Sequence, residues 1–540
     1  MSRDNHREFR CFGPPGTGKT TWLSRQIEKA VASRGPTDVI VCSFTRAAVH
    51  ELNSRQLPIP ESNLGTLHAI AYRALGNPNI CETAAGFKAF HEATRWELGG
   101  STRESVDDGY AAGGNTDDDM IFLSLQAKRA RQIPPEMWTP GEQRLWRDWE
   151  AFKAETGQCD FTDLISDALK YTYEAPGSPS VGFFDEGQDF TPLELALVRH
   201  WGDQMETFTL AGDDDQSIYG FKGVTTAGLL NPPLPPENVR ILKQSYRVPA
   251  KVHRRADRYI HQIHNDWRQE KEYLPREAEG QLLSMRSTYK YPDEALDLAL
   301  EYTELGKTVL WLTSCSYMLS PLIKKLREQG IPFSNPYRRR RGDWNPLYGK
   351  KNQNSVARMV AAFMNMDERV CDFWLGSEIK QWAKLLKGVF NKGAKDQIDR
   401  LKDDIHVNIA SLHHYMTPEN ARAAVGEQQM QWLKDNLLAS WKKSADYVFR
   451  VAERGAFWLT YEPLMRLGTI HSVKGGQADV VILFPDVSPQ ALQNPTLITG
   501  RDYKEEPFQN ALIRQFYVGM TRAKETLVIC SPASSNCVQL

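Results

Sequence analysis

A glycine-rich octapeptide, GPPGTGKT at residues 13–20, has the residue types and spacing of a phosphate-binding loop. A short apolar run, FRCF, precedes it and a helix-forming stretch follows it, which is the context that such a loop requires. Backbone N–H groups of the turn and of the helix N-terminus can surround phosphate oxygens. An ordinary Gly/Pro turn is the alternative interpretation. The pattern predicts a nucleotide site with Lys19 on the β- and γ-phosphates and Thr20 on Mg²⁺; its residues are Gly13, Pro14, Pro15, Gly16, Thr17, Gly18, Lys19, Thr20 and Thr21.

Two adjacent acids end the apolar run VGFFDEGQD at residues 181–189. Neighbouring carboxylates at the end of a buried strand repel each other unless a cation lies beside them. If the strand frays early, they are two ordinary surface acids. In the chemical interpretation, Asp185 holds Mg²⁺ and Glu186 accepts the proton of an attacking water. The pair therefore predicts hydrolysis of the bound nucleotide.

A third stretch, LAGDDDQSIYGFKG at residues 210–223, combines carboxylates, a glutamine and aromatic side chains in one strand end and loop. Phosphoryl transfer also needs positive charge near the γ-phosphate in the transition state. Arg247 in QSYRVP and Arg522 in FYVGMTRAKE are candidates, although sequence spacing alone does not bring them to the loop at 13–20.

Short β-rich runs, such as VRILKQSYR at 239–247, alternate with helix-like segments in two parts of the chain, which predicts parallel α/β sheets. Residues 70–175 and 336–455 have mostly helical patterns instead, and the second of these segments begins with the basic run YRRRRGDW. That run either faces solvent or contacts duplex phosphates. The simplest layout is two α/β cores, each interrupted by a helical insertion.

Composition limits the remaining classes. The 66 basic and 67 acidic residues give a formal net charge of -1, which neither supports nor excludes a nucleic-acid partner. The 8 cysteines form no CxxC pair, so we expect reduced thiols and no structural metal. No apolar run approaches the roughly 20 residues of a membrane span. We expect a cytoplasmic protein, in a bacterium or a phage-infected cell, without membrane contact.

The order of these motifs resembles that of superfamily 1 helicases of the UvrD/Rep/PcrA type. The resemblance rests on nine segments, which together span nearly the whole chain apart from the two insertions: GPPGTGKT, SFTRAAVHEL, GTLHAIAYRAL, DFTDL, FFDEGQDFTPLE, LAGDDDQSIYGFKG, LKQSYRVP, GTIHSVKGGQADVVIL and RQFYVGMTRAKETLVI.

The resemblance implies two RecA-like cores of the P-loop NTPase class with mainly helical insertions. The first core comprises 1–69 and 176–245, with a 1B-like insertion at 70–175. The second core comprises 246–335 and 456–540, with a short 2B-like insertion at 336–455.

The resemblance also implies roles for individual residues. Glu186, Gln216, Arg247 and Arg522 are the expected catalytic residues, with Gln216 reading the γ-phosphate and the two arginines acting as arginine fingers. Tyr246 stacks on the adenine, and Gln477 lies near the nucleotide. The expected DNA-binding residues are Phe44, Thr45, Arg46, Thr66, His68, Tyr219, Phe221, Lys222 and His471, the aromatic ones stacking on bases.

The expected activity is an ATP-dependent and Mg²⁺-dependent DNA helicase that moves 3′ to 5′ on single-stranded DNA and engages junctions of single-stranded and duplex DNA. One alternative is a translocase that displaces proteins without processive unwinding. Another is a nucleotide-switched subunit of a larger DNA-processing or defence complex. The sequence leaves open the pathway, the oligomeric state, accessory partners and whether RNA is accepted.

Three positions depart from the family pattern. No glutamine precedes Gly13, where relatives place an adenine-reading glutamine. Phe221-Lys222 stands where relatives often have Trp-Arg, and lysine lacks the planar fork of arginine. Gln477 replaces a common glutamate, which removes a negative charge.

Overall fold

The structure, a computed structural model, describes residues 7–43, 59–98, 116–339, 341–347, 355–364, 373–426, 428–459, 461–489 and 506–540. Contacts group the chain into two units. The first comprises Met1–Ser284, Pro485–Ile529 and Ser534–Leu540, and the second comprises Met285–Phe484 and Cys530–Ala533. Among the described residues, no helix is both long enough and apolar enough to cross a membrane.

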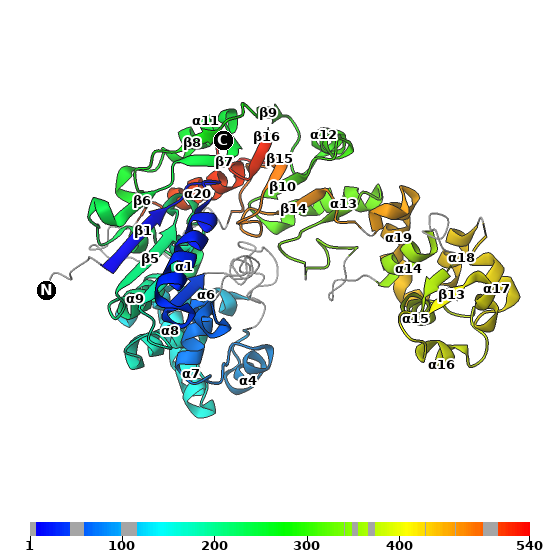
Figure 1. The fold of residues 1–540 in the computed structure, drawn as a ribbon, viewed down its shortest axis with the longest axis horizontal. Coiled ribbons are helices and arrows are strands. Elements are labelled where there is room, and N and C mark those ends of the chain that lie inside the picture. The colour runs from blue at the N-terminus through cyan, green and yellow to red at the C-terminus, as the bar shows by residue number, and fades with distance from the viewer. Residues whose placement is uncertain are drawn as a thin grey trace. The chain divides into compact units, whose positions relative to one another are not determined.

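The first unit contains a six-stranded sheet in the order β3-β2-β4-β5-β1-β6, of which Figure 1 labels β1, β5 and β6. All of its pairings are parallel. The strands are β1 (Glu8–Phe12), β2 (Val39–Ser43), β3 (Leu64–Thr66), β4 (Val181–Asp185), β5 (Thr207–Gly212) and β6 (Val239–Ile241). Because parallel strands all end at one edge, the loops that follow β4, β5 and β1 are neighbours.

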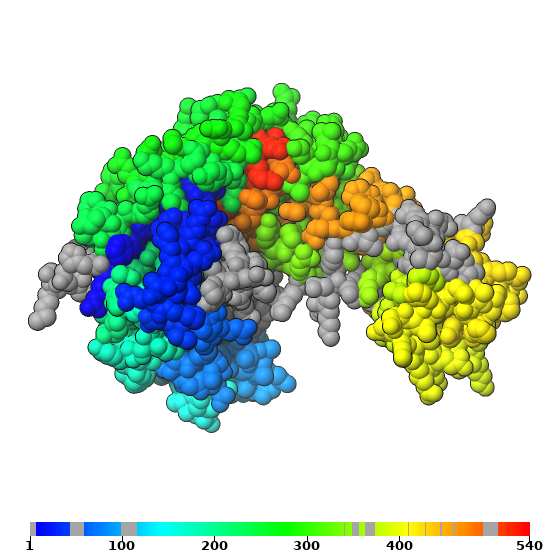
Figure 2. Space-filling view, viewed as in Figure 1, coloured from blue at the N-terminus to red at the C-terminus, as the bar shows by residue number. Residues whose placement is uncertain are grey.

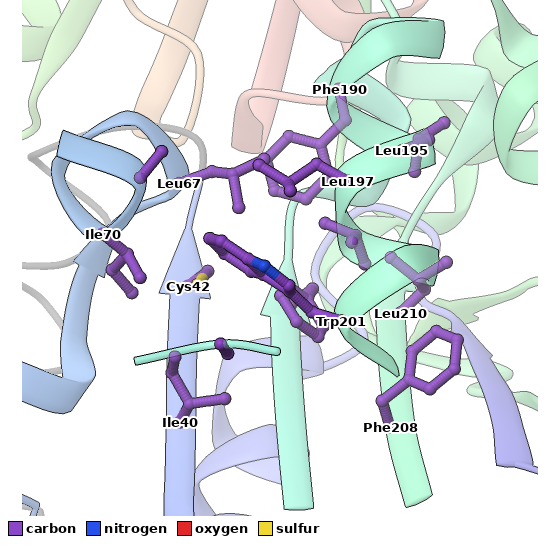
Figure 3. Packing of buried hydrophobic residues seen from close by; sticks show 14 of the residues in the cluster. Ile40, Cys42, Leu67, Ile70, Phe190, Leu195, Leu197, Trp201, Phe208 and Leu210 are labelled. Carbon is purple, nitrogen blue, oxygen red and sulfur yellow. The ribbon is translucent and has the colours of Figure 1, made fainter. Parts of the chain in front are cut away.

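Apolar side chains cover both faces of this sheet. In β2, Ile40 and Cys42 join the core on one face, whereas Val39 and Val41 join the core on the other. The first core packs under α3 (Leu67–Ala74), α8 (Phe161–Tyr171) and α9 (Pro192–Gly202), with the indole of Trp201 at its centre (Figure 3). The second core packs under α1 (Lys19–Arg34). Burial on both faces explains the nearly continuous apolar runs of these strands.

The segment between β3 and β4 is helical. Besides α3 and α8, it contains α4 (Ala84–Thr94), α6 (Asp117–Ala130) and α7 (Pro140–Thr156). Phe90, Phe122 and Trp149 lie in its own apolar core, with edge-to-face ring contacts on Trp149. Aromatic pairs of this geometry add to the hydrophobic stabilisation of the core.

A buried ionic network connects three of these helices. Asp160 is fully buried and caps α8, and its Oδ2 accepts hydrogen bonds from Arg129 (2.5 Å), Trp149 Nε1 (2.9 Å) and Lys153 (3.2 Å). Burial would raise the pKa of Asp160, but attraction by Arg129 and Lys153 outweighs burial and holds this pKa well below its usual range.

A second six-stranded sheet has the order β11-β14-β10-β15-β16-β9. Strand β10 pairs in parallel with β14 and β15, and β14 with β11. The strands are β9 (Gln281–Met285), β10 (Val309–Thr313), β11 (Phe333–Ser334), β14 (Met465–Thr469), β15 (Ala478–Leu483) and β16 (Ala523–Cys530), and the accompanying helices are α12 (Asp293–Glu304), α13 (Ser320–Glu328) and α20 (Gln509–Met520). The two sheets confirm the predicted α/β class with two cores.

Within the second unit, helices dominate the segment between β11 and β14. They are α14 (Ser355–Met364), α15 (Gly376–Leu385), α16 (Ala394–Asp399), α17 (Pro418–Ala423), α18 (Gln429–Asn436) and α19 (Ala439–Glu453), beside an antiparallel pair of β12 (Phe373–Leu375) and β13 (His406–Asn408). The yellow part of this segment forms a compact lobe (Figure 2).

The β-rich run at 239–247 is not one strand. Its first part is β6, at the edge of the first sheet, whereas its second part begins β7 (Gln244–Pro249), which pairs with β8 (Leu274–Arg276) in a separate two-stranded sheet. Helix α11 (Ala250–Ile260) follows directly.

We predict that Asp160→Asn lowers the free energy of unfolding at pH 7 by about 3 kcal/mol, because Arg129 and Lys153 stay buried and lose one of the two carboxylates that they share, the other being Asp163. The pKa of Asp160 is lowered by folding, so its contribution is present above the unfolded-state pKa of about 3.9 and is lost as pH falls through the lower folded-state pKa. The difference between wild type and variant should therefore shrink below about pH 4.

Urea unfolding of both proteins across this pH range measures the effect, with Glu155→Gln, an exposed acid on α7, as the control. A constant difference at all pH values would contradict the assigned ionic role.

Candidate nucleotide and DNA site

The glycine-rich loop connects β1 to α1 in the predicted way. Gly16 and Gly18 both have φ of 77°, a backbone region that residues with a Cβ rarely adopt. A Cβ at Gly13 would lie 2.8 Å from Lys19 Cβ, and one at Gly16 would lie 2.5 Å from Arg247 Cβ. Gly18 is the N-cap of α1 and has no side chain to accept from the N–H groups of the first turn. These groups can therefore face an anion.

The acidic pair lies at the end of β4 and binds the lysine of the loop. Lys19 Nζ is 2.8 Å from Asp185 Oδ1 and 2.8 Å from Glu186 Oε1. Burial alone would lower the pKa of Lys19, but the two carboxylates outweigh it and raise this pKa. Burial raises the pKa of Asp185, and the Glu186 charge adds to the rise, against the opposing effect of Lys19. The predicted phosphate-binding and magnesium-binding groups are thus brought together.

Glu186 adopts the left-handed backbone conformation, with φ of 57° and ψ of 37°. A non-glycine residue stays in this conformation when its surroundings fix it. Gln188, which is buried, supplies part of that constraint: its Nε2 donates to Glu186, and its Oε1 accepts from the backbone N–H of Asp213 at 2.9 Å. Gln188 therefore joins the acidic pair to the loop after β5.

The loop after β5 brings Gln216 to Arg522. Gln216 Nε2 donates to Asp213 Oδ2 at 2.8 Å, and Gln216 Oε1 accepts from Arg522 Nη2 at 2.8 Å. Arg522 is 1% exposed, and its Nε donates to the Val518 carbonyl. Two predicted catalytic residues that are 306 positions apart are therefore in direct contact within the first unit.

Strand β7 runs beside the glycine-rich loop. Ser245 Oγ donates to the Pro15 carbonyl at 2.9 Å, and the backbone N–H of Tyr246 donates to the Gly16 carbonyl at 2.8 Å. The Tyr246 ring is 73% exposed, so one face of it is available for a base next to the loop. Arg247 is half-buried and packs against Gly16.

The donor set fits MgATP. Close-packed glycines, a helix N-terminus and Lys19 suit a triphosphate, while the Thr20 hydroxyl and the Asp185 carboxylate are the oxygen ligands that Mg²⁺ prefers. Thr20 is half-buried at the start of α1, and Thr21, next to it, is exposed.

The predicted DNA-binding residues of the first unit differ in exposure. Thr66 Oγ1 accepts from the backbone N–H of Ala69 and caps α3, and His68 Nδ1 lies 3.4 Å from Glu194 Oε1. Tyr219 is buried at 4% exposure, whereas Phe221 is half-buried. The two rings make an edge contact at 6.0 Å, and Lys222 Nζ lies 5.0 Å from the Tyr219 ring centroid.

The remaining predicted residues lie elsewhere. Phe44, Thr45 and Arg46 lie outside the described residues. His471 and Gln477 belong to the second unit, where His471 is buried and the backbone N–H of Gln477 donates to the Tyr337 hydroxyl.

Sequence reasoning missed several residues beside the site. Besides Gln188, they are Arg268 and Lys271, which bind the three aspartates at 213–215, and Tyr273, whose hydroxyl donates to the Pro15 carbonyl. The available signal was indirect: three consecutive aspartates directly after a buried strand require cations.

Comparison with known proteins supports the helicase resemblance. Residues 6–232 match the UvrD/REP helicase N-terminal domain. DNA helicase II of Escherichia coli is 31% identical over 371 residues, which cover 60% of this chain and 48% of the relative.

Two further relatives agree. The ATP-dependent DNA helicase UvrD2 of Mycobacterium tuberculosis is 27% identical over 279 residues, covering 45% of this chain and 40% of the relative. The putative ATP-dependent DNA helicase YjcD of Bacillus subtilis is 24% identical over 243 residues, which cover 40% of this chain and 31% of the relative. The alignments with these three relatives thus span between 31% and 48% of their lengths. Together with the motif order and the two sheets, these matches support a likeness to helicases of the UvrD/Rep/PcrA type, with a UvrD/REP helicase N-terminal domain at residues 6–232.

Proposed function

We propose that this protein is an ATP-dependent DNA helicase that translocates 3′ to 5′ on single-stranded DNA. The observation that carries the proposal is the contact of Gln216 with Arg522. Hydrogen bonds through Asp213 and Gln188 connect Gln216 to Glu186 of the acidic pair. A nucleotide-binding site needs only the glycine-rich loop, whereas this constellation supplies groups for hydrolysis. The direction of movement rests on the family resemblance.

Residues of the glycine-rich loop and the acidic pair have separate roles in the proposed hydrolysis. ATP with Mg²⁺ supplies the phosphoanhydride to be broken and charge neutralisation at its oxygens. Lys19 places a fixed positive charge on the phosphates, and Thr20 and Asp185 would hold Mg²⁺. Glu186 accepts the proton of the attacking water.

Gln216 and the two arginines act on the charge that develops in the transition state. The Gln216 amide has its nitrogen on Asp213, so its oxygen is directed toward a donor. Arg522, and Arg247 beside Gly16, donate to oxygens of the transferring phosphoryl group. Charges fixed before the reaction need no reorganisation during it.

The same loop offers a path from hydrolysis to DNA. Gln216 ends one 3₁₀ turn, Asp214–Gln216, and Phe221 lies in the next, Gly220–Lys222. An aromatic face there can stack on a base without regard for sequence. Among the loop aromatics, the half-buried Phe221 is the better stacking candidate, because Tyr219 is 4% exposed.

A second candidate function is a translocase that strips proteins from single-stranded DNA. The short helical segment between β11 and β14 favours it, since the corresponding insertion regulates unwinding in relatives. Strand separation of a duplex with a 3′ single-stranded tail distinguishes the two functions.

We predict that single-stranded DNA strongly stimulates steady-state ATP hydrolysis, and that Glu186→Gln lowers the stimulated kcat by about 10²- to 10⁴-fold because the general base is lost. The measurement compares no nucleic acid, single-stranded DNA, duplex DNA and single-stranded RNA.

Glu155→Gln serves as the control for Glu186→Gln and should leave the stimulated kcat unchanged. Turnover without any response to nucleic acid would contradict the motor proposal, and absence of turnover would favour the nucleotide-switched subunit.

We further predict that Phe221→Ala raises the concentration of single-stranded DNA needed for half-maximal stimulation by about 5- to 150-fold, since stacking on one base contributes about 1–3 kcal/mol. Tyr171→Ala removes a 66% exposed ring of the same unit and should leave this concentration unchanged. An equal shift in both variants would mean that Phe221 does not stack on DNA.

A further inference from the structure

The segment Trp267–Tyr273, which we name the clasp, contacts the loop after β5 through buried charges. The Lys271 ammonium is 2.7 Å from Asp213 Oδ1, 2.5 Å from Asp214 Oδ1 and 3.0 Å from Asp215 Oδ2. An ammonium has three N–H donors, and here three carboxylates surround it. The Lys271 side chain is 2% exposed, so this is an interior charge rather than a solvated surface lysine.

Other clasp residues complete the pairing of the aspartates. Arg268 Nε and Nη2 donate to Asp215 at 3.1 and 2.8 Å, and the backbone N–H of Gln269 donates to Asp214 at 2.8 Å. Burial raises the pKa of Asp214 to about 6, while attraction by Lys271 and Arg268 overcomes burial and lowers the pKa of Asp215 to about 2. The loop therefore keeps this arrangement only with the clasp cations present.

The clasp determines the orientation of Gln216 through Asp213. Lys271 holds Asp213 Oδ1, and Gln216 Nε2 donates to Asp213 Oδ2 on the same carboxylate. Because the Gln216 amide nitrogen donates to Asp213, the Gln216 amide oxygen faces Arg522. The Asp215 backbone N–H also donates to Asp213 Oδ1, at 3.3 Å. Without Lys271, this longer bond holds the carboxylate less firmly, and Gln216 can rotate away.

The clasp also contacts the other parts of the site. Tyr273 OH donates to the Pro15 carbonyl of the glycine-rich loop at 2.8 Å. At its other end, the Trp267 carbonyl accepts from Arg514 Nη2 at 2.7 Å, and Arg514 lies on α20, the helix that precedes Arg522. One short segment thus fixes the phosphate loop, the Gln216 loop and the arginine helix.

We propose that Lys271 is a positioning residue for ATP hydrolysis, which orients Gln216 toward Arg522 by fixing the Asp213 carboxylate. The inference rests on the proposed ATPase function, and it assigns Lys271 no contact with ATP. Its loss should therefore slow turnover without weakening nucleotide binding.

The test measures kcat and KM for ATP with saturating single-stranded DNA, together with the affinity for a fluorescent ATP analogue. We expect Lys271→Met to lower kcat by about 10- to 100-fold, because misplacing a supporting group by a small distance has effects of this size. The analogue affinity should stay within about three-fold, since a positioning role acts on the transition state rather than on ground-state binding. Lys251→Met, which removes an exposed lysine on α11, is the matched control.

A charge-balanced variant separates positioning from charge compensation and guards against misfolding. Lys271→Met combined with Asp214→Asn removes one positive and one negative charge, so the net charge of the buried cluster is unchanged, yet Asp213 still lacks its ammonium. We expect kcat to remain low relative to Asp214→Asn alone, with a thermal melting temperature near that of Asp214→Asn.

The outcomes are distinct. Recovery of kcat in the double variant to the level of Asp214→Asn would overturn positioning, because charge compensation would then explain the role of Lys271. Wild-type kcat in Lys271→Met, or a loss of analogue affinity equal to the loss of kcat, would also overturn it. Absence of ATP turnover in the wild type would overturn the proposed function and this inference together.

Discussion

The candidate site depends on the parallel order β4-β5-β1 in the first sheet. Because these strands run in the same direction, the acidic pair, the Gln216 loop and the glycine-rich loop all leave the sheet at one edge. The Gly13 N–H donates to the Gly212 carbonyl, which keeps the glycine-rich loop level with the end of β5. If β1 or β4 shifted by one residue in its pairing with β5, every side chain of the shifted strand would turn to the opposite face of the sheet. The acidic pair, the Gln216 loop and the glycine-rich loop would then be separated.

The carboxylates gathered at this edge of the sheet repel one another, and cations from distant segments of the chain offset this repulsion. Lys19 forms ion pairs with Asp185 and Glu186, while Lys271 and Arg268 form ion pairs with the aspartates after β5. Buried charges are costly unless they are paired and hydrogen-bonded, so the two groups of acids need separate cations. On the proposed function, Lys19 must remain available for phosphate. The loop after β5 therefore needs a cation of its own, and Lys271 supplies it.

Local sequence was sufficient for the parts of the site that lie within one strand–loop–helix unit. The glycine-rich loop and the acidic pair carry their own context, so both were predicted from the residues alone. The contact of Gln216 with Arg522 spans 306 positions and was accessible only through family resemblance. Lys271 was missed because a lysine in a charged stretch ordinarily faces water, and its burial depends on tertiary packing. The run at 239–247 was misleading for a similar reason, because β-propensity does not specify which sheet a strand joins.

The loop after β5 joins carboxylates and aromatic rings because its two ends have different neighbours. The clasp holds Asp213–Asp215 at one end. At the other end, Gly223 has φ of 88° and packs so closely on α6 that a Cβ there would lie 2.6 Å from the Ala127 carbonyl oxygen. Gln216 and Phe221 lie between these two anchors. On the proposed function, a change at Gln216 must therefore reach Phe221 through the intervening backbone or break one of the anchors, and the buried ion pairs of the clasp make the second route the costlier one.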